Sequence, residues 1–251
     1  MYKNEVDRVS QVAADKVRFL NENPVGFFVS SLIAGMFIGF GILLSSTVGA
    51  MGSFSFMKLL MGISFSCALS LVIMAGAELF TGNNMVMAMG FMKKTVSAKD
   101  VLKLWLICYV GNWLGSIFLA LLFSRTGLMT EAFCAAVASV AAAKVSIPFG
   151  PLLLRAILCN MLVCLAVWCS NKMTSESGKL IMIFWIIVIF FTAGFEHSIA
   201  NMVLLSLDFL APDTAMTMGS YFYNILTATL GNILGGVFLV ALPYALMGKN
   251  E

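Results

Sequence analysis

Apolar and polar residues divide the chain into a polar first segment followed by six long apolar stretches. Residues 3–21 place apolar side chains on one helical face and Lys, Arg, Asp and Glu on the other. The apolar face consists of Val6, Val9, Ala13, Val17 and Leu20. We therefore expect residues 1–24 to form an amphipathic helix on the cytoplasmic membrane surface or against a channel mouth, ended by Asn23 and Pro24.

The apolar stretches predict membrane-spanning helices. Lipid satisfies no backbone hydrogen bonds, so only helices or a closed barrel cross a bilayer. Runs such as residues 102–123 are continuously apolar and too long for barrel strands. The six predicted spans cover residues 25–48, 57–92, 102–123, 151–169, 180–210 and 221–247.

The second and fifth spans are too long to be single helices. A helix over residues 59–92 would measure about 51 Å, against roughly 30 Å of hydrocarbon. Turn and capping residues interrupt both stretches, at residues 76–84 and 194–198. We expect the first half of span 2 to end near Leu79 and a half-helix to follow at residues 85–92, capped by Thr81 or Asn83.

The second half of the chain repeats the first. Glu78 precedes Asn83 by five positions, and Glu196 precedes Asn201 in the same way 118 residues later. The motif G-N-x-x-G follows in each half, at residues 111–115 and 231–235. Three spans per half is an odd number, so the second half must enter the membrane from the opposite side, as an inverted repeat.

These patterns predict an all-α membrane protein of six transmembrane helices in two inverted three-helix repeats, with spans 2 and 5 broken. The predicted parts are the cytoplasmic amphipathic helix (1–24), the first repeat (25–123), an outer connection (124–148), the second repeat (149–247) and a cytoplasmic tail (248–251). Residues 132–144 of the connection are rich in Ala and Val and predict a further helix.

Composition and charge agree with a membrane protein. The chain is 61% hydrophobic and 11% charged, which a soluble domain of 251 residues would not be. With the N-terminus inside, eleven of the 15 Lys and Arg fall in inner segments and four in outer ones. By the positive-inside rule we expect both termini to be cytoplasmic, in the inner or plasma membrane of a prokaryotic cell.

Several functional classes find no support in the sequence. The six Cys lack metal-ligand spacing and the chain has one His, so we expect no metal and no cofactor. Catalytic motifs of the H-E-x-x-H and G-x-S-x-G kind are absent, so we expect no enzyme and no nucleic-acid partner. A neutral-solute channel for water or glycerol remains an alternative, although its Asn-Pro-Ala pairs are missing.

Ionisable residues within spans are rare and point to function. Glu78, Glu196 and His197 all lie at the two breaks. We favour a structural role for the two Glu, in which each carboxylate accepts the unpaired N–H groups of a half-helix. His197 has no counterpart in the first repeat, where Leu79 takes its place, and we expect it to supply a hydrogen bond or a proton.

Other candidates surround the breaks. The Thr81 hydroxyl can cap the half-helix or line a pathway, and the sequence leaves both roles open. Lys144, on the outer side, would be solvated and idle on an ordinary loop, whereas beside an anion pathway it would raise the local anion concentration at the mouth. Bulky apolar residues near the breaks form either core packing or hydrophobic constrictions that gate by dewetting. They are Phe65, Leu69, Leu79, Phe80 and Phe190.

Three motifs, at residues 76–83, 158–168 and 194–202, resemble those of the formate/nitrite transporter family, and the resemblance extends over essentially the whole chain. Within the family the sequence is most similar to the hydrosulfide-channel branch. The resemblance implies an aquaporin-like protomer in a homopentamer, with one pathway per protomer. It implies that the Thr81 loop lines the pore and that His197 is the central histidine.

The resemblance also implies roles for further residues. Lys144 matches the vestibule lysine of the family, and Asn160 matches the asparagine near it. The bulky apolar residues fall at or near the constriction positions, Phe65 and Phe190 on the outer side, and Val163 joins the inner constriction. We therefore expect passive conduction of a small monovalent anion or its conjugate acid, with hydrosulfide favoured and formate or nitrite suitable. Proton-coupled formate or nitrite transport is the other alternative.

Overall fold

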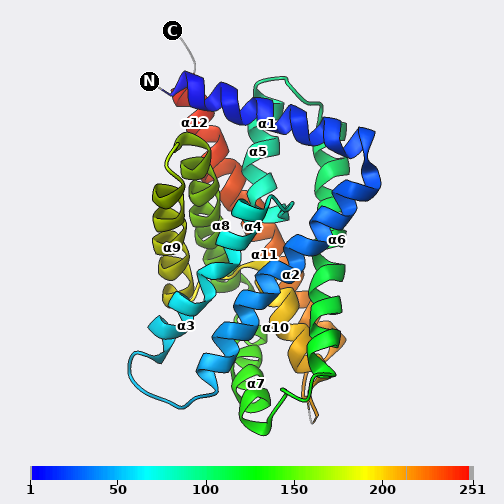
Figure 1. Cartoon of the computed structure of the whole chain (residues 1–251), viewed down its shortest axis with the longest axis vertical. Coiled ribbons are helices and arrows are strands. Elements are labelled where there is room, and N and C mark those ends of the chain that lie inside the picture. The colour runs from blue at the N-terminus through cyan, green and yellow to red at the C-terminus, as the bar shows by residue number, and fades with distance from the viewer. Residues whose placement is uncertain (1, 213, 249–251) are drawn as a thin grey trace.

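The computed structural model describes residues 2–212 and 214–248, and every regular element in them is a helix (Figure 1). The elements are α1 (Lys3–Glu22), α2 (Pro24–Gly49), α3 (Met57–Phe65), α4 (Cys67–Ala75), α5 (Phe80–Met92), α6 (Ala98–Ser124), α7 (Glu131–Val145), α8 (Phe149–Lys172), α9 (Glu176–Ala193), α10 (Ser198–Leu210), α11 (Met218–Gly236), a π-helical turn (Val237–Ala241) and α12 (Leu242–Met247). Six helical segments among them are long and apolar enough to span a membrane, which confirms the predicted all-α fold with six transmembrane spans.

The spans pack closely where glycines meet backbone. A Cβ at Gly115 of α6 would collide with the backbone carbonyl of Leu32 on α2. A Cβ at Gly235 of α11 would collide in the same way with the carbonyl of Ile157 on α8. The pairs α2–α6 and α8–α11 therefore make equivalent crossings in the two halves, each of which depends on small residues.

Both predicted breaks exist, but their edges differ from the prediction. The first half of span 2 ends at Ala75, followed by Gly76 in the left-handed region (φ 75°), and α5 begins at Phe80 rather than at residue 85. The second break has the same form, with Gly194 (φ 81°) after α9. The first half of span 2 is also divided at Ser66 into α3 and α4, which the sequence pattern does not predict.

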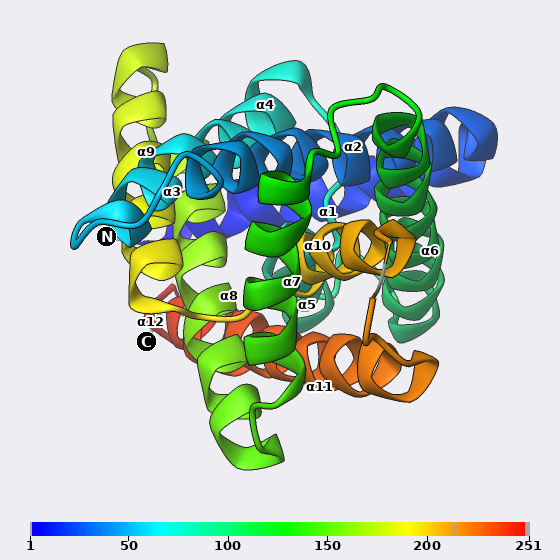
Figure 2. The ribbon, with the colours of Figure 1, turned by 90° about the horizontal axis from the view of Figure 1, so that it is seen from below.

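Two additional helices lie at opposite ends of the bundle. The amphipathic α1 crosses the end that carries both termini and packs against α5, whereas α7 lies at the other end beside α10 (Figures 1 and 2). The connection predicted as helical over residues 132–144 is α7, and it begins one residue earlier. The half-helices α5 and α10 thus lie toward opposite ends of the molecule, the relation that an inverted repeat requires.

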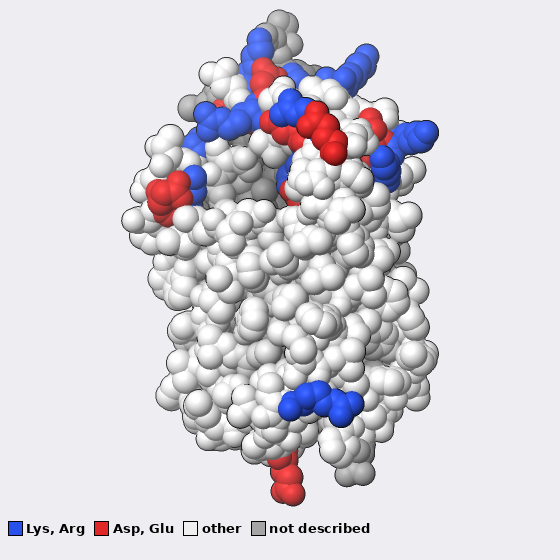
Figure 3. All heavy atoms as spheres, turned by 45° about the vertical axis from the view of Figure 1, so that its right-hand side comes forward, with Lys and Arg blue, Asp and Glu red and all other residues white. Residues whose placement is uncertain are grey.

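On the face that Figure 3 shows, charged side chains are concentrated at the end covered by α1, and a broad belt without charge crosses the middle of the molecule. Such a belt matches the hydrocarbon layer of a bilayer. Many large apolar side chains of the spans are exposed, among them Phe40 on α2, Leu106 on α6 and Trp185 on α9. The inside location of the termini stays a prediction, and most of the predicted tail, residues 249–251, lies outside the described residues.

Candidate functional site

Asparagine side chains from neighbouring spans form hydrogen bonds with the backbone at the two helix breaks. At the first break, Asn112 Oδ1 accepts the backbone N–H of Phe80 at 2.8 Å, and its Nδ2 donates to the carbonyls of Glu78 (2.9 Å) and Ser31 (2.6 Å). A buried break would otherwise leave these groups unpaired in an apolar surrounding. Asn112 therefore caps α5, and neither Thr81 nor Asn83 does, contrary to the prediction.

Asn232 performs the same task at the second break. Its Oδ1 accepts the N–H of Ser198 at 2.9 Å, and its Nδ2 donates to the carbonyls of Glu196 (2.9 Å) and Ala156 (2.8 Å). The repeated G-N-x-x-G motif thus has a physical purpose that the sequence did not reveal: its asparagine replaces the backbone partners that a broken helix lacks.

The two glutamates are held by lysines and asparagines. Glu78 is bound by Lys16 Nζ, at 2.6 Å from both carboxylate oxygens, and by Asn83 Nδ2 at 2.9 Å. No backbone N–H of α5 reaches its carboxylate, so the predicted capping role is wrong. The carboxylate instead neutralises a lysine of α1.

Glu196 has equivalent partners. Lys144 Nζ lies 2.9 Å from both of its oxygens, and Asn201 Nδ2 lies at 2.7 Å. The role of Lys16 was missed from the sequence. Its only signal is that Lys16 and Lys144 both lie in a helix just before the first span of a repeat.

His197 and Thr81 bring the two breaks together. Thr81 Oγ1 lies 3.0 Å from His197 Nε2, and His197 Nδ1 accepts the N–H of Ala200 at 3.1 Å. Nδ1 already accepts a hydrogen bond from the N–H of Ala200, so it carries no hydrogen. The hydrogen of the neutral ring is therefore on Nε2, which donates it to Thr81 Oγ1. This arrangement holds the imidazole neutral and leaves the Thr81 hydroxyl proton free for another acceptor.

Asn160 lies at the centre of the protomer. Its Nδ2 donates to the carbonyls of Asn232 (2.6 Å) and Thr81 (3.2 Å) and to Asn84 Oδ1 (3.0 Å). Asn160 was expected to lie near Lys144, but none of these hydrogen bonds joins the two residues. The amide that does bond the Lys144 backbone carbonyl, at 3.0 Å, is that of Asn224.

The predicted constriction residues are all buried, but they differ in position. Phe65 and Phe190 meet edge to face with ring centroids 5.8 Å apart, and Phe190 lies against the His197 ring at 6.0 Å. Phe80 instead packs against Tyr109 at 5.0 Å, and is not part of the inner cavity lining.

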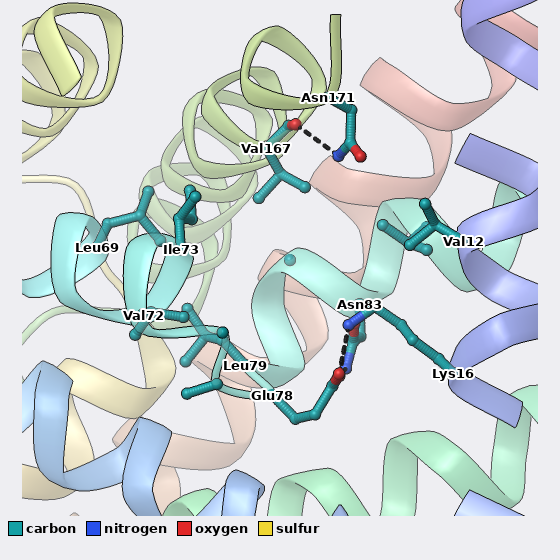
Figure 4. Close-up of a pocket in the computed structure, with 14 residues that line it drawn as sticks. Val12, Lys16, Leu69, Val72, Ile73, Glu78, Leu79, Asn83, Val167 and Asn171 are labelled. Carbon is teal, nitrogen blue, oxygen red and sulfur yellow. Dashed lines mark hydrogen bonds and ion pairs between the residues drawn. The ribbon is translucent and has the colours of Figure 1, made fainter. Parts of the chain in front are cut away.

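Three cavities approach the Thr81–His197 pair from the two sides. At the end that carries α7, which is the outer side in the predicted orientation, a cavity of about 290 Å³ reaches Lys144 and Glu196, and a narrower one of about 50 Å³ reaches His197 and Phe190. On the side of α1, a cavity of about 230 Å³ is lined by Lys16 and Glu78 (Figure 4). Leu69, Leu79, Gly82 and Val167 also line this inner cavity, whereas Val163 does not.

The two wide cavities differ in charge. The outer one is lined by the cations Lys58, Lys144 and Arg155 and by one carboxylate, that of Glu196. The inner one is lined by one cation, Lys16, and one carboxylate, Glu78. Among the described residues, no hydrogen bond or ion pair engages the side chain of Lys58 or Arg155. The outer mouth therefore carries an excess of positive charge.

The fold and the site together define a multi-pass α-helical membrane protein with cavities that approach its centre from both ends. A sequence profile of the formate/nitrite transporter family matches residues 3–246, and the chain belongs to this family. It is 38% identical to the nitrite transporter NirC of Salmonella typhimurium over 97% of this chain and 91% of that protein.

Solved structures agree with this assignment. An FNT family ion channel superposes with a TM-score of 0.94 at 37% identity, covering 98% of this chain and 99% of the other. A pentameric formate channel with formate bound gives a TM-score of 0.79 at 27% identity, covering 88% of this chain and 96% of the other.

Proposed function

We propose that each protomer conducts a small monovalent anion between the outer and inner cavities, past Thr81 and His197. One observation carries this proposal: the Thr81–His197 hydrogen bond, 3.0 Å long, joins the two breaks. His197 lines the outer narrow cavity, and Leu79 and Gly82, on either side of Thr81, line the inner one. Any solute that passes between the cavities must displace or exchange this bond.

The surroundings of the Thr81–His197 pair favour an anion, although the pair itself carries no formal charge. The half-helices α5 and α10 begin at Phe80 and Ser198, beside Thr81 and His197, so both positive helix ends face the centre. Displacement of the pair frees the Nε2 hydrogen of His197 and the hydroxyl of Thr81, and both can donate to an acceptor.

The phenylalanine pair disfavours a fully charged species. An anion crossing Phe65 and Phe190 loses hydration that apolar rings do not replace. A neutral imidazole offers hydrogen bonds there but no formal charge. The species that crosses the rings is therefore partly the conjugate acid: the anion takes a proton from water only on entering the rings, after the outer cavities, and the acid returns a proton to water in the inner cavity.

Relatives guide the choice of substrate. A relative at 38% identity is named a nitrite transporter, and a structural neighbour holds formate. Hydrosulfide, nitrite and formate are all small conjugate bases of neutral acids, and we propose that all three enter the pathway, with hydrosulfide as a substrate to be tested directly. By analogy with the pentameric neighbour, we propose a homopentamer, with one pathway per protomer. The excess of Lys and Arg in the predicted inner segments supports the further proposal that both termini are cytoplasmic.

Flux into proteoliposomes tests the proposal. Anion uptake should fall strongly in His197→Asn, which changes the ring that meets Thr81, and in Lys144→Glu, which places a second carboxylate beside Glu196. Lys99→Glu, an exposed change outside all three cavities, should leave uptake unchanged. Unchanged flux and selectivity in both site variants would refute the assigned roles. Water permeability, measured on the same vesicles, tests the alternative of a neutral-solute channel: high water permeability without anion flux would favour that alternative.

A further inference from the structure

The narrow outer cavity, the one of about 50 Å³ beside His197, has polar lining groups that differ in availability. Lys144 is bound to both oxygens of Glu196. Both amide hydrogens of Asn201 are donated, to Glu196 and to Asn224. His197 uses Nδ1 for Ala200 and Nε2 for Thr81. These three side chains are thus already engaged within the protein.

The two remaining polar side chains are Ser45 and Ser46 on α2. Ser45 is 1% exposed, and its hydroxyl oxygen is buried with no hydrogen-bond partner in the described part of the chain. No hydrogen bond to the described residues engages the hydroxyl of Ser46 either. A buried hydroxyl without a partner carries a desolvation penalty unless a solute or water satisfies it.

Several other hydroxyls of the spans donate to the backbone carbonyl four residues earlier, and Ser45 does not. Ser31 and Thr47, on the same helix, donate to the carbonyls of Phe27 and Leu43, four residues earlier. Ser116 and Ser170 do the same on α6 and α8. Ser45 has the same option in a regular helix but does not use it, so its hydroxyl remains available to whatever occupies the cavity.

We propose that Ser45, assisted by Ser46, is a hydrogen-bond donor to the small monoanion in the narrow outer cavity and contributes to selectivity among anions. This inference rests on the proposed conduction. The anion, having left the lysine-lined outer cavity, accepts the Ser45 hydroxyl before it reaches His197 and Thr81. Anions that accept strong hydrogen bonds, such as formate and nitrite, gain most from this donor, and weak acceptors such as iodide gain least.

The variant Ser45→Ala distinguishes a hydrogen-bond donor from a side chain whose role is purely steric. Alanine removes one oxygen and widens the cavity, so a purely steric role predicts equal or faster flux. Loss of a donor predicts slower flux at limiting formate, by about tenfold, because hydrogen bonds to charged groups are the strong ones. The ratio of formate to iodide flux should fall with it.

The matched control is Thr47→Val, which removes a hydroxyl two positions away on α2 that is already bound to Leu43. Its flux and its anion ratio should equal those of the unmodified protein. Ser45→Cys keeps the side-chain size but substitutes a weak donor, and it should lose flux as Ser45→Ala does. Oligomer elution in detergent shows that each variant is assembled.

Each outcome bears on one claim. Unmodified protein that conducts no anion would refute the proposed conduction. Unmodified protein that conducts, together with Ser45→Ala and Ser45→Cys variants of equal or greater formate flux and an unchanged formate-to-iodide ratio, would overturn the role of Ser45 alone.

Discussion

At the scale of single residues, the ion pairs explain how lysines can line a pathway without binding every anion tightly. Lys144 and Lys16 are each held by a carboxylate on both oxygens, and Glu196 is almost fully buried. A bare ammonium at this depth would be expensive and would trap an anion. On the proposed pathway, the lysine of such a pair would attract the anion, and the glutamate would keep that attraction moderate by competing for the ammonium.

We predict that Glu196→Gln destabilises the protein, because it leaves the Lys144 ammonium with no carboxylate in a largely buried site. Breaking a buried pair from one side costs up to 3–5 kcal/mol, and because Lys144 keeps partial access to solvent we expect about 2 kcal/mol here. Thermal unfolding in detergent measures the loss. Asp15→Asn, which breaks the exposed Arg18–Asp15 pair on α1, is the control and should change stability by roughly 0–1 kcal/mol. Equal effects of the two variants would contradict the prediction.

The sequence reveals some of these residues and conceals others for a physical reason. His197 and Thr81 could be found because a span contains few polar residues and because His197 breaks the symmetry between the halves. The lysine partners of the glutamates could not be found, since Lys16 lies 62 positions from Glu78 and Lys144 lies 52 from Glu196. Local patterns carry no information about contacts at such separations.

At the scale of elements, the start of each half-helix is set by a residue of another helix. Spans 2 and 5 are too long for single helices, so each must contain a break. Local capping rules wrongly assign the cap of the half-helix in span 2 to Thr81 or Asn83. Asn112, 32 positions away, accepts the first N–H of α5, and Asn232, 34 positions away, accepts the first N–H of α10. Only α10 also has a local cap, since the His197 ring accepts the N–H of Ala200. An amide can satisfy an N–H and two carbonyls at once, which a carboxylate cannot do.

We predict that Asn112→Leu and Asn232→Leu each destabilise the protein, by about 3 kcal/mol, because each leaves one N–H and two carbonyls unpaired away from water. Thermal unfolding and amide exchange at residues 78–82 or 196–200 measure the effect. Asn21→Leu removes an amide that bonds only the exposed Lys103 and should be close to neutral. Unaltered exchange at the breaks would show that the asparagines are not their main support.

Helix crossings give a second test at this scale. In Gly115→Ala the new methyl group meets the Leu32 carbonyl, so α2 and α6 must separate and stability should fall by about 1–3 kcal/mol. A Cβ at Gly219 on α11 would meet only Thr217 Oγ1, at an ordinary contact distance of 3.7 Å, and Gly219→Ala should stabilise the protein by about 0.5 kcal/mol through helix propensity. Opposite signs in thermal unfolding are expected, and a fall of similar size in both would reject the packing argument.

At the scale of the whole molecule, the two ends of the pathway are unequal although the halves repeat. The inner cavity has one lysine and one glutamate, whereas the outer cavity adds Lys58 and Arg155 to the equivalent pair. The Lys58 ammonium lies over the second break, where a Cβ on Gly194 would be 3.0 Å from it. Excess positive charge at a concave mouth raises the local anion concentration and the entry rate.

We therefore predict that neutralising both cations, in Lys58→Gln with Arg155→Gln, slows anion uptake from the outer side about threefold at low ionic strength. In 1 M salt the screening length falls to about 3 Å, and the difference should disappear. Side-resolved flux in oriented vesicles is the measurement, and Arg125→Gln, which removes an outer cation that lines neither outer cavity, is the control. A passive channel must leave the final anion distribution unchanged, so the effect belongs to the rate alone. A loss that persists in high salt would mean that these side chains shape the cavity instead of steering the anion.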